Sequence, residues 1–429
     1  MSKDPAASWM IPMSDKIVKD KRAIASWCLF DFGNSSFTTV IITAVFNVYF
    51  VETIAKEDGT RLWSIGLFVS NLIVIFTAPV IGAIADHGGR KKRFLLVSFL
   101  TCVALTACLS FLQPGDVTLA LILVVLANAA FASGENLVAA FLPELAEPED
   151  VAKISAWGWG VGYIGGLAAL ALCLGAMELW GMATGARLSG VIVAVFFLIG
   201  GLPTFLFVKE QERGFVPIKE AVRNGIRESG ETIRDRAKLP DLFSFFAAAL
   251  VLQIGIYGVI QYAGIYGTQL AGLSQKDVVF ILLVSQVSAF FGAMASGRMA
   301  SIFGTTNTVR MTTLLWALAG LLLLLKPDRV GFWAAALLAG FAMGASLSAI
   351  RATVALLAPK GRSGEIFGFW GFFGRVAAIL APAGNLLLLY FFNERLEGGI
   401  AYFLGCFVVS FFLLGRVNEE RGRACAAGS

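Results

Sequence analysis

Apolar residues fall into twelve long runs along the chain, and short polar segments separate them. A helix needs about 20 consecutive apolar residues to cross the hydrocarbon core of a bilayer, and each run approaches that length. The pattern therefore predicts an all-α membrane protein with twelve transmembrane helices. The spans lie near residues 24–50, 62–85, 94–112, 117–141, 154–178, 189–208, 242–266, 277–300, 308–325, 332–357, 365–391 and 398–415.

The longest polar interruption divides these spans six and six. Two six-helix bundles joined by a linker are the predicted organisation. Its parts are an N-terminal segment (1–23), an N-terminal bundle (24–208), a linker (209–241), a C-terminal bundle (242–415) and a tail (416–429).

The linker carries Ile218, Val222, Ile226 and Ile233 at near-helical spacing. Such spacing favours an amphipathic helix lying at the membrane surface. Two glycines in the same stretch weaken a helix interior by about 1 kcal/mol each. A solvated tether with short helical turns is therefore the other open interpretation.

Composition agrees with a membrane protein and excludes several other classes. The 429 residues are 57% hydrophobic and only 15% charged, whereas soluble domains carry roughly a quarter charged residues. Most Lys and Arg residues flank the spans on the side of the N-terminus, so both termini are expected in the cytoplasm. Topology thus explains the net charge of +5, and a nucleic-acid partner is not expected.

Metal and disulfide chemistry have little support in the sequence. The six cysteines show no Cys-x-x-Cys pairing, and the chain has one histidine, His87. A metal site needs several ligands, so no metal is expected.

The turn after the second span has a distinctive pattern. Gly82, Asp86, Gly89, Arg90 and Lys91 stand in the order G-x-x-x-D-x-x-G-R-K. This resembles the loop-2/3 signature of the major facilitator superfamily, which implies a cytoplasmic gate motif whose aspartate caps a neighbouring helix end. The resemblance implies two pseudo-symmetric six-helix halves. The segment 297–304 repeats the glycine, short polar residue and glycine spacing in the second half.

Further segments resemble one branch of that superfamily. Residues 26–37 read SWCLFDFGNSSF, 141–146 read FLPELA, and 155–166 read SAWGWGVGYIGG. These are similar to motifs of the vacuolar effluxer branch, which is related to autophagy amino-acid effluxers. The late segment from Arg351 through 365–369 to Arg375 resembles the same branch, which implies efflux of amino acids or similar solutes.

The first span has a polar face. Asp31, Asn34, Ser35 and Thr38 fall at i, i+3, i+4 and i+7, which places them on one side of a helix. Charged groups at membrane depth mark transport pathways by default. We therefore take Asp31 as a candidate for proton coupling and the other three as candidates for substrate binding. A structural carboxylate bonded to a neighbouring helix is the alternative.

Opposite charges occupy matched depths in spans four and ten. Asn128 and Glu135 share a face of span four, and Arg351 lies at a similar depth in span ten. One interpretation pairs Glu135 with Arg351 across the halves as a gate. Another makes Arg351 the anchor of a substrate carboxylate, and a third is a fixed buried pair. Glu135 is the second proton-coupling candidate, and Asn128 is a substrate-binding candidate.

Other candidates for substrate binding lie in spans seven and eleven. Arg375 lies deep in span eleven without an adjacent carboxylate, so it requires a distant partner or an anionic ligand. Gln253, Tyr257 and Gln261 form a stripe of polar groups suited to a polar or zwitterionic solute, although helix–helix bonding would also explain them. Trp370 is a candidate wall of the site.

Stripes of small residues occur in two further spans. Gly158, Gly162 and Gly166 give span five a flat face, and Ser288, Gly292 and Ser296 do the same for span eight. Small residues allow close helix approach. We expect these stripes to form a sliding surface between the halves.

Motifs for nucleotide binding or catalysis are absent from the sequence, so we expect a transporter rather than an enzyme, with no cofactor. The first hypothesis is a secondary active transporter that moves an amino acid or related solute outward by alternating access, with proton coupling. The alternative is a multidrug-like exporter of amphipathic compounds, and a non-transporting receptor ranks below both. Expected partners are a small-molecule substrate, the bilayer and protons. We expect a monomer in the inner membrane if the chain is bacterial.

Overall fold

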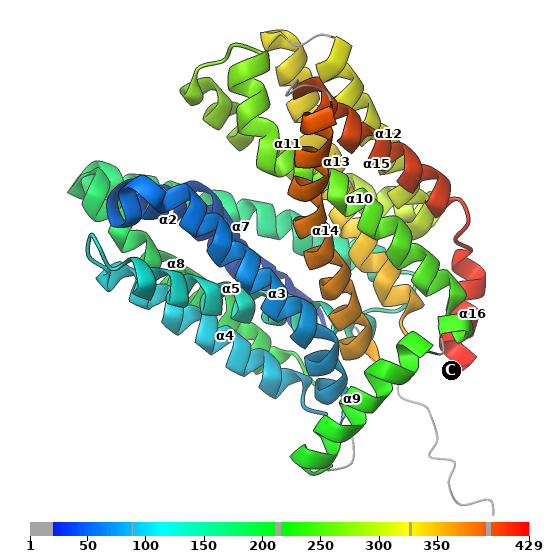
Figure 1. The fold of residues 1–429 in the computed structure, drawn as a ribbon. Helices are drawn as coiled ribbons and strands as arrows, with labels where there is room; N and C mark the ends of the chain where they lie inside the picture. Colours follow the sequence, from blue (N-terminus) through cyan, green and yellow to red (C-terminus); the bar gives the residue numbers. More distant parts are fainter. Residues whose placement is uncertain are drawn as a thin grey trace, which may run out of the picture.

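The computed structural model describes residues 20–87, 89–210, 216–234, 236–325, 328–391 and 396–428. Most of the predicted N-terminal segment therefore lies outside the described residues. Within the described ranges the chain forms helices and no strand. Twelve of the helices are long and apolar enough to cross a membrane, which confirms the predicted fold class (Figure 1).

The N-terminal half contains six spans. The first is α1 with two π-helical segments and a short helix after it. The elements are α1 (Lys21–Ser36), η2 (Phe37–Ala44), α2 (Phe46–Tyr49), η3 (Phe50–Ala55), α3 (Gly59–Asp86), α4 (Lys91–Cys108), α5 (Val117–Ala139), α6 (Leu142–Leu145), α7 (Val151–Trp180) and α8 (Met182–Phe207).

The linker contains α9 (Ile218–Arg234), and six spans follow it. The tail forms a last helix. These elements are α10 (Pro240–Ile265) with η7 (Tyr266–Leu270), α11 (Gln275–Phe303), α12 (Thr305–Leu325), α13 (Arg329–Leu357), α14 (Ser363–Phe391), α15 (Leu396–Leu414) and α16 (Glu419–Gly428).

The two halves repeat the same packing. Helix α1 packs on α7 and α8, and its counterpart α10 packs on α14 and α15. Both first spans end in π-helical turns. The matched turns also share a backbone feature, because Gly89 has φ +61° and Gly304 has φ +83°, a left-handed conformation that glycine adopts without steric cost.

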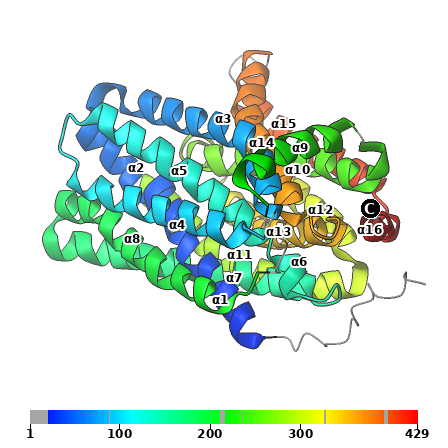
Figure 2. The same ribbon diagram turned by 90° about the horizontal axis from the view of Figure 1, so that it is seen from below.

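The halves lie together at one end of the molecule. We call it the linker end, because α9 and the α3–α4 and α13–α14 turns lie there. The ribbons of the halves diverge away from this end (Figure 1). Seen from the linker end, α9 lies over α3 and α14 (Figure 2). Helices α3 and α14 pack against each other across the halves, as do α7 and α11.

The stripes of small residues pack differently from the prediction. A methyl group at Gly162 or Gly166 would meet α1 and the segment after it, which belong to the same half, and one at Gly292 would meet Phe341 of α13. The sliding-surface interpretation was therefore wrong for Gly162, Gly166 and Gly292, whereas Gly158 does face Arg351 of the second half. The contact between α7 and α11 instead places Gly160 beside Met294 and Gly297 beside Ala156.

Candidate functional site between the halves

A buried ion pair joins the first span to the second half. Arg351 of α13 donates through one terminal nitrogen to the Asp31 carboxylate of α1 at 2.7 Å. The side chains are only 4% and 11% exposed. The predicted pairing of Arg351 with Glu135 is therefore wrong. The prediction relied on the similar depths of Glu135 and Arg351 in their spans. Depth does not show which helices meet when the halves pack together, and Arg351 of α13 meets α1.

Every nitrogen of the Arg351 guanidinium is engaged at this contact. Its Nε donates to the Ser155 hydroxyl at 3.2 Å, and its second terminal nitrogen donates to the Ser155 carbonyl at 2.9 Å. The guanidinium lies 4.5 Å from the Trp27 ring and 5.4 Å from the Trp159 ring. In this state the donor fork that a substrate carboxylate would use is already bonded within the protein.

Gly158 of α7 makes room for this pair. An added Cβ there would lie 2.5 Å from both Arg351 and the Asp31 carboxylate. Ser155, one turn earlier, also donates to the carbonyl of Ser348 at 2.8 Å. One cluster of polar contacts therefore joins α1, α7 and α13, and Gly158 allows these helices to pack closely.

A second ion pair crosses the halves nearer the middle of the spans. Arg375 of α14 donates to Glu135 of α5 at 3.4 Å. Arg375 lies 12 residues after the start of α14, which corresponds to about 18 Å along the helix. Its side chain is 17% exposed and that of Glu135 is 28% exposed. This pair supplies the distant partner that the sequence required for Arg375.

Polar groups of α10 lie beside α14 next to Arg375. A Cβ at Gly374 would lie 3.3 Å from Gln253 Oε1 and 3.9 Å from the Tyr257 hydroxyl, so α10 presents both side chains here. Among the described residues, the Gln253 amide nitrogen and Trp370 Nε1 are buried without a hydrogen-bond partner. Buried polar groups are normally bonded, so we take these atoms as candidates for ligand binding.

Some buried polar groups of the first half also lack a hydrogen-bond partner in the described structure. Asn136 lies beside Gly371 of α14, and its amide nitrogen has no partner in the described part of the chain, nor do Trp159 Nε1 and the Tyr163 hydroxyl. Asn136 directly follows Glu135 on α5. The sequence analysis missed this group as a candidate, although its place beside the in-span carboxylate was a usable signal.

The polar face of the first span is only partly available. Asn34 Oδ1 is buried without a partner in the described structure. Ser35 donates to the Asp31 carbonyl, and Thr38 donates to the Ser35 carbonyl. Thr38 also lies in η2, so the helix register changes just before it. Of the four residues, Asp31 makes a contact between the halves and Asn34 has a buried oxygen without a partner in the described structure.

The remaining predicted candidates lie away from the ion pairs. Asn128 donates to the Ser70 hydroxyl of α3 at 2.9 Å, a contact within the first half. Gln261 is exposed near the end of α10.

The gate motif joins α3 to the start of α14. The Asp86 carboxylate accepts from the backbone N–H groups of Gly364 and Glu365, at 3.0 and 2.8 Å. A carboxylate at a helix N-terminus satisfies free N–H groups and the helix dipole. Gly82 permits this approach, because a Cβ there would lie 2.0 Å from the Gly364 carbonyl oxygen.

Lys91 completes the motif and is almost fully buried. Its ammonium donates to the Ser363 hydroxyl at 2.9 Å and lies 3.6 Å from Asp86. It also binds Glu144 of α6. Glu210 accepts from the backbone of Lys91, and burial raises the pKa of that carboxyl.

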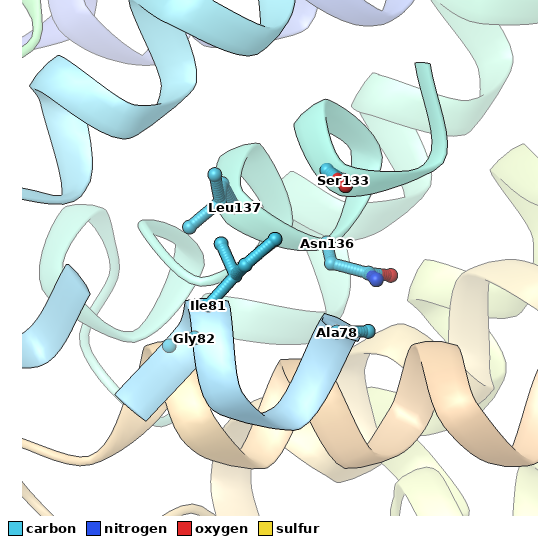
Figure 3. Close-up of a pocket in the computed structure, with 7 residues that line it drawn as sticks. Ala78, Ile81, Gly82, Ser133, Asn136 and Leu137 are labelled. Carbon is cyan, nitrogen blue, oxygen red and sulfur yellow. The ribbon is translucent and has the colours of Figure 1, made fainter. Parts of the chain in front are cut away.

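A small pocket lies beside this contact. Ala78 and Ile81 of α3, Ser133 and Asn136 of α5, and Gly364 of α14 line it (Figure 3). It is narrow and lies at the contact between α3 and α14, which we call the seam. Among the described residues, no three His, Cys, Asp or Glu side chains are grouped to hold a metal.

Comparison with known proteins fits this architecture. Residues 61–427 match the family described as vacuole effluxer Atg22 like. The chain belongs to this family. The Atg22-like chain is also 28% identical to the MFS-type transporter YxiO of Bacillus subtilis (strain 168), over 92% of this chain and 94% of that protein.

Solved structures of major facilitator proteins share the fold of this Atg22-like chain. The human organic anion transporter MFSD10 gives a TM-score of 0.73 at 15% identity, covering 93% of this chain and 100% of that one. FucP in the outward conformation gives 0.71 at 14% identity, covering 94% and 99%. The Atg22-like protein is therefore an integral, multi-pass major facilitator transporter of a small-molecule substrate, and not an enzyme.

Proposed function

We propose that this protein exports an amino acid or a related zwitterionic metabolite by alternating access. The observation that supports this most directly is the Glu135–Arg375 pair. It joins the halves, it is partly exposed, and unpartnered polar atoms belong to Gln253, which lies beside Gly374, and to Asn136, which follows Glu135 on α5. A zwitterion carries both charges needed to replace the pair.

The proposed binding step exchanges one set of ionic contacts for another. The substrate carboxylate binds the Arg375 guanidinium, which offers a planar fork of donors. The substrate ammonium binds the Glu135 carboxylate. Each protein charge keeps a partner during the exchange, so neither is left unpaired at membrane depth, which would be costly. A ligand with a single charge satisfies only one of the two groups.

Alternating access then uses the contacts at the linker end. The distribution of Lys and Arg predicts that both termini lie in the cytoplasm, and with that orientation this structure corresponds to the state closed toward the cytoplasm. Opening inward must break Asp31–Arg351 and the bonds from Asp86 to α14. Protonation of Asp31 would remove its negative charge and weaken the first contact, which gives proton coupling a physical route.

The test is substrate binding and counterflow in liposomes, with three matched ligands for each amino acid tried. These are the zwitterion, its carboxamide and its N-acetyl form. We expect the zwitterion to bind best, Arg375→Gln to erase its advantage over the carboxamide, and Glu135→Gln to erase its advantage over the N-acetyl form. Equal binding of all three, or preference for uncharged amphipathic compounds, would contradict the proposal and favour a multidrug-like exporter.

A further inference from the structure

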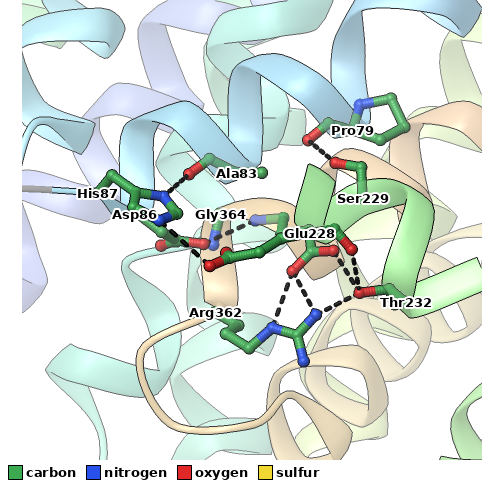
Figure 4. A network of polar contacts seen from close by, with 10 residues as sticks. Pro79, Ala83, Asp86, His87, Glu228, Ser229, Thr232, Arg362 and Gly364 are labelled. Atoms are coloured by element: carbon green, nitrogen blue, oxygen red, sulfur yellow. Dashed lines mark hydrogen bonds and ion pairs between the residues drawn. The ribbon is translucent and has the colours of Figure 1, made fainter. Parts of the chain in front are cut away.

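Helix α9 is docked through its small and polar face. Ser229 donates to the Pro79 carbonyl of α3 at 3.5 Å, and Thr232 donates to Glu365 of α14 at 2.6 Å. Gly225 fits against Ile84 of α3. His87 at the end of α3 lies 3.2 Å from Glu228. Figure 4 shows the polar contacts of this set, which reach α3 of the first half and α14 of the second.

The large apolar side chains Val222, Ile226 and Ile233 of α9 point away from the protein. They are 37%, 56% and 56% exposed. At 3.6 residues per turn, they form one stripe beside the docked face. Lys219, Arg223 and Arg227 form the next stripe around the helix, and all three are exposed.

The depth of the docked face places these stripes beside the membrane. Pro79 lies seven residues before the end of the spanning helix α3, which is about 10 Å along its axis. Since α3 is a candidate membrane span, a helix bonded at that level is expected near the boundary between hydrocarbon and headgroups. An apolar stripe there with basic side chains on its flank is typical of helices that bind anionic lipid surfaces.

We propose that α9 binds the anionic phospholipid surface of the membrane leaflet at the linker end. Val222, Ile226 and Ile233 insert among the upper acyl chains. Lys219, Arg223 and Arg227 contact phosphate groups. Arg227 also lies 3.6 Å from Glu231 on the same helix, but both side chains are about half exposed, and such pairs contribute little. The acidic side chains Glu220 and Glu231 face water.

The experiment uses a bimane label on a single introduced cysteine in the full-length protein, in nanodiscs that contain brominated lipid. The label replaces Ile226 on the apolar stripe or Glu220 on the acidic side as the matched control. The two cysteines that are not buried, Cys108 and Cys425, are changed to serine. Nanodiscs contain neutral lipid alone or neutral lipid mixed with phosphatidylglycerol.

We expect stronger quenching at position 226 than at 220, and a rise at 226 when anionic lipid is added. Arg223→Gln with Arg227→Gln should remove that rise, because each basic group changes partitioning roughly fivefold. Glu220→Gln with Glu231→Gln, in the protein labelled at position 226, should not remove it. Raising salt from about 0.1 to about 1 M should act like the arginine changes, since the Debye length falls from about 10 to about 3 Å.

Three results would overturn the proposal. Equal quenching at the two positions would mean that the apolar stripe does not face lipid. Strong quenching at 226 that is the same with and without phosphatidylglycerol would show that α9 does not require anionic lipid. Absence of quenching at both positions would show that the apolar stripe contacts a protein partner or water and does not contact lipid.

Discussion

Arg351 and Asp31 come from opposite halves of the chain, 320 residues apart, yet their charged groups lie 2.7 Å apart in a buried setting. Such a pair is well suited to a two-state gate. While the linker end is closed, each charge neutralises the other away from water. In the proposed alternating-access cycle, both groups must find water or other partners when this end opens, so the pair would bias the equilibrium toward the closed state.

Removing one member of this pair should open the linker end. Asp31→Asn leaves the Arg351 charge buried and unpaired, and loss of one partner of a buried pair costs about 3–5 kcal/mol. The reporter is a disulfide between cysteines placed at Ala156 and Gly297, where the two Cβ atoms would lie 3.0 Å apart. We expect lower crosslinking yield in Asp31→Asn and partial recovery in Asp31→Asn with Arg351→Gln.

Unchanged crosslinking in Asp31→Asn would contradict the gate role of the pair. If Asp31→Asn lowers the unfolding temperature but leaves crosslinking unchanged, the pair stabilises the fold and does not control opening. Transport driven by a proton gradient should be lost in the same variant while substrate exchange persists. Equal loss of gradient-driven transport and of substrate exchange would show that Asp31 is not the proton-coupling group.

The second pair should respond to substrate rather than to gate closure. Glu135→Gln and Arg375→Gln each leave one charge of a partly exposed pair without its partner. Loss of a desolvated charged contact typically costs about 2–5 kcal/mol in binding, so we expect zwitterion affinity to fall by at least tenfold in each. Titration calorimetry measures it. In a double-mutant cycle the two effects should not add, and full additivity would show that substrate does not use the pair as a unit.

The fold could be predicted from the sequence because hydropathy and span length depend on each segment alone. Asp31, Glu135, Arg351 and Arg375 were found for the same reason, since each charge lies in an apolar run. Their pairing was not predictable, because it depends on how α13 and α14 dock against the first half. Arg351 meets α1 and Arg375 meets α5.

Other features had weaker signals in the sequence. The roles of Ser155 and Trp27 depend on where the Arg351 side chain lies, and both stood inside motifs that the family resemblance had already marked. The π-helical segment that begins at Phe37 has no sequence signature that we used. The glycine stripes gave the correct property, close packing, but not the partner helix.

Gly158 offers a test of the first pair that changes no charge. An alanine methyl there would meet Arg351, Asp31 and Trp27 within 2.7 Å, so Gly158→Ala should separate the pair and reduce the 156–297 crosslink. Gly175→Ala on the same helix is the matched control, because nothing lies within 4 Å of an added Cβ there. If both variants crosslink like the parent protein, Gly158 does not set the geometry of the pair.

Gly82 tests the gate motif in the same way. Its added Cβ would lie 2.0 Å from the Gly364 carbonyl, which is backbone and cannot move aside as a flexible side chain would. Gly82→Ala should therefore separate α3 from α14 and weaken the bonds from Asp86, as should Asp86→Asn. Gly405→Ala is the control, since that position is open. Unchanged 156–297 crosslinking in Gly82→Ala would show that the α3–α14 and α7–α11 contacts open independently.

The bond between Thr232 and Glu365 should determine how firmly α9 stays bound at the seam between α3 and α14. Glu365 is buried and also accepts from Arg362 at 2.9 Å. Thr232→Val keeps the side-chain shape but removes the donor, leaving one carboxylate oxygen without that bond at a cost of about 1–3 kcal/mol. We expect faster trypsin cleavage after Arg223 and Arg227, because α9 leaves the seam more often. Glu231→Gln, on the exposed side of the helix, should cleave at the parent rate, and the same rate in Thr232→Val would mean that the seam does not depend on this bond.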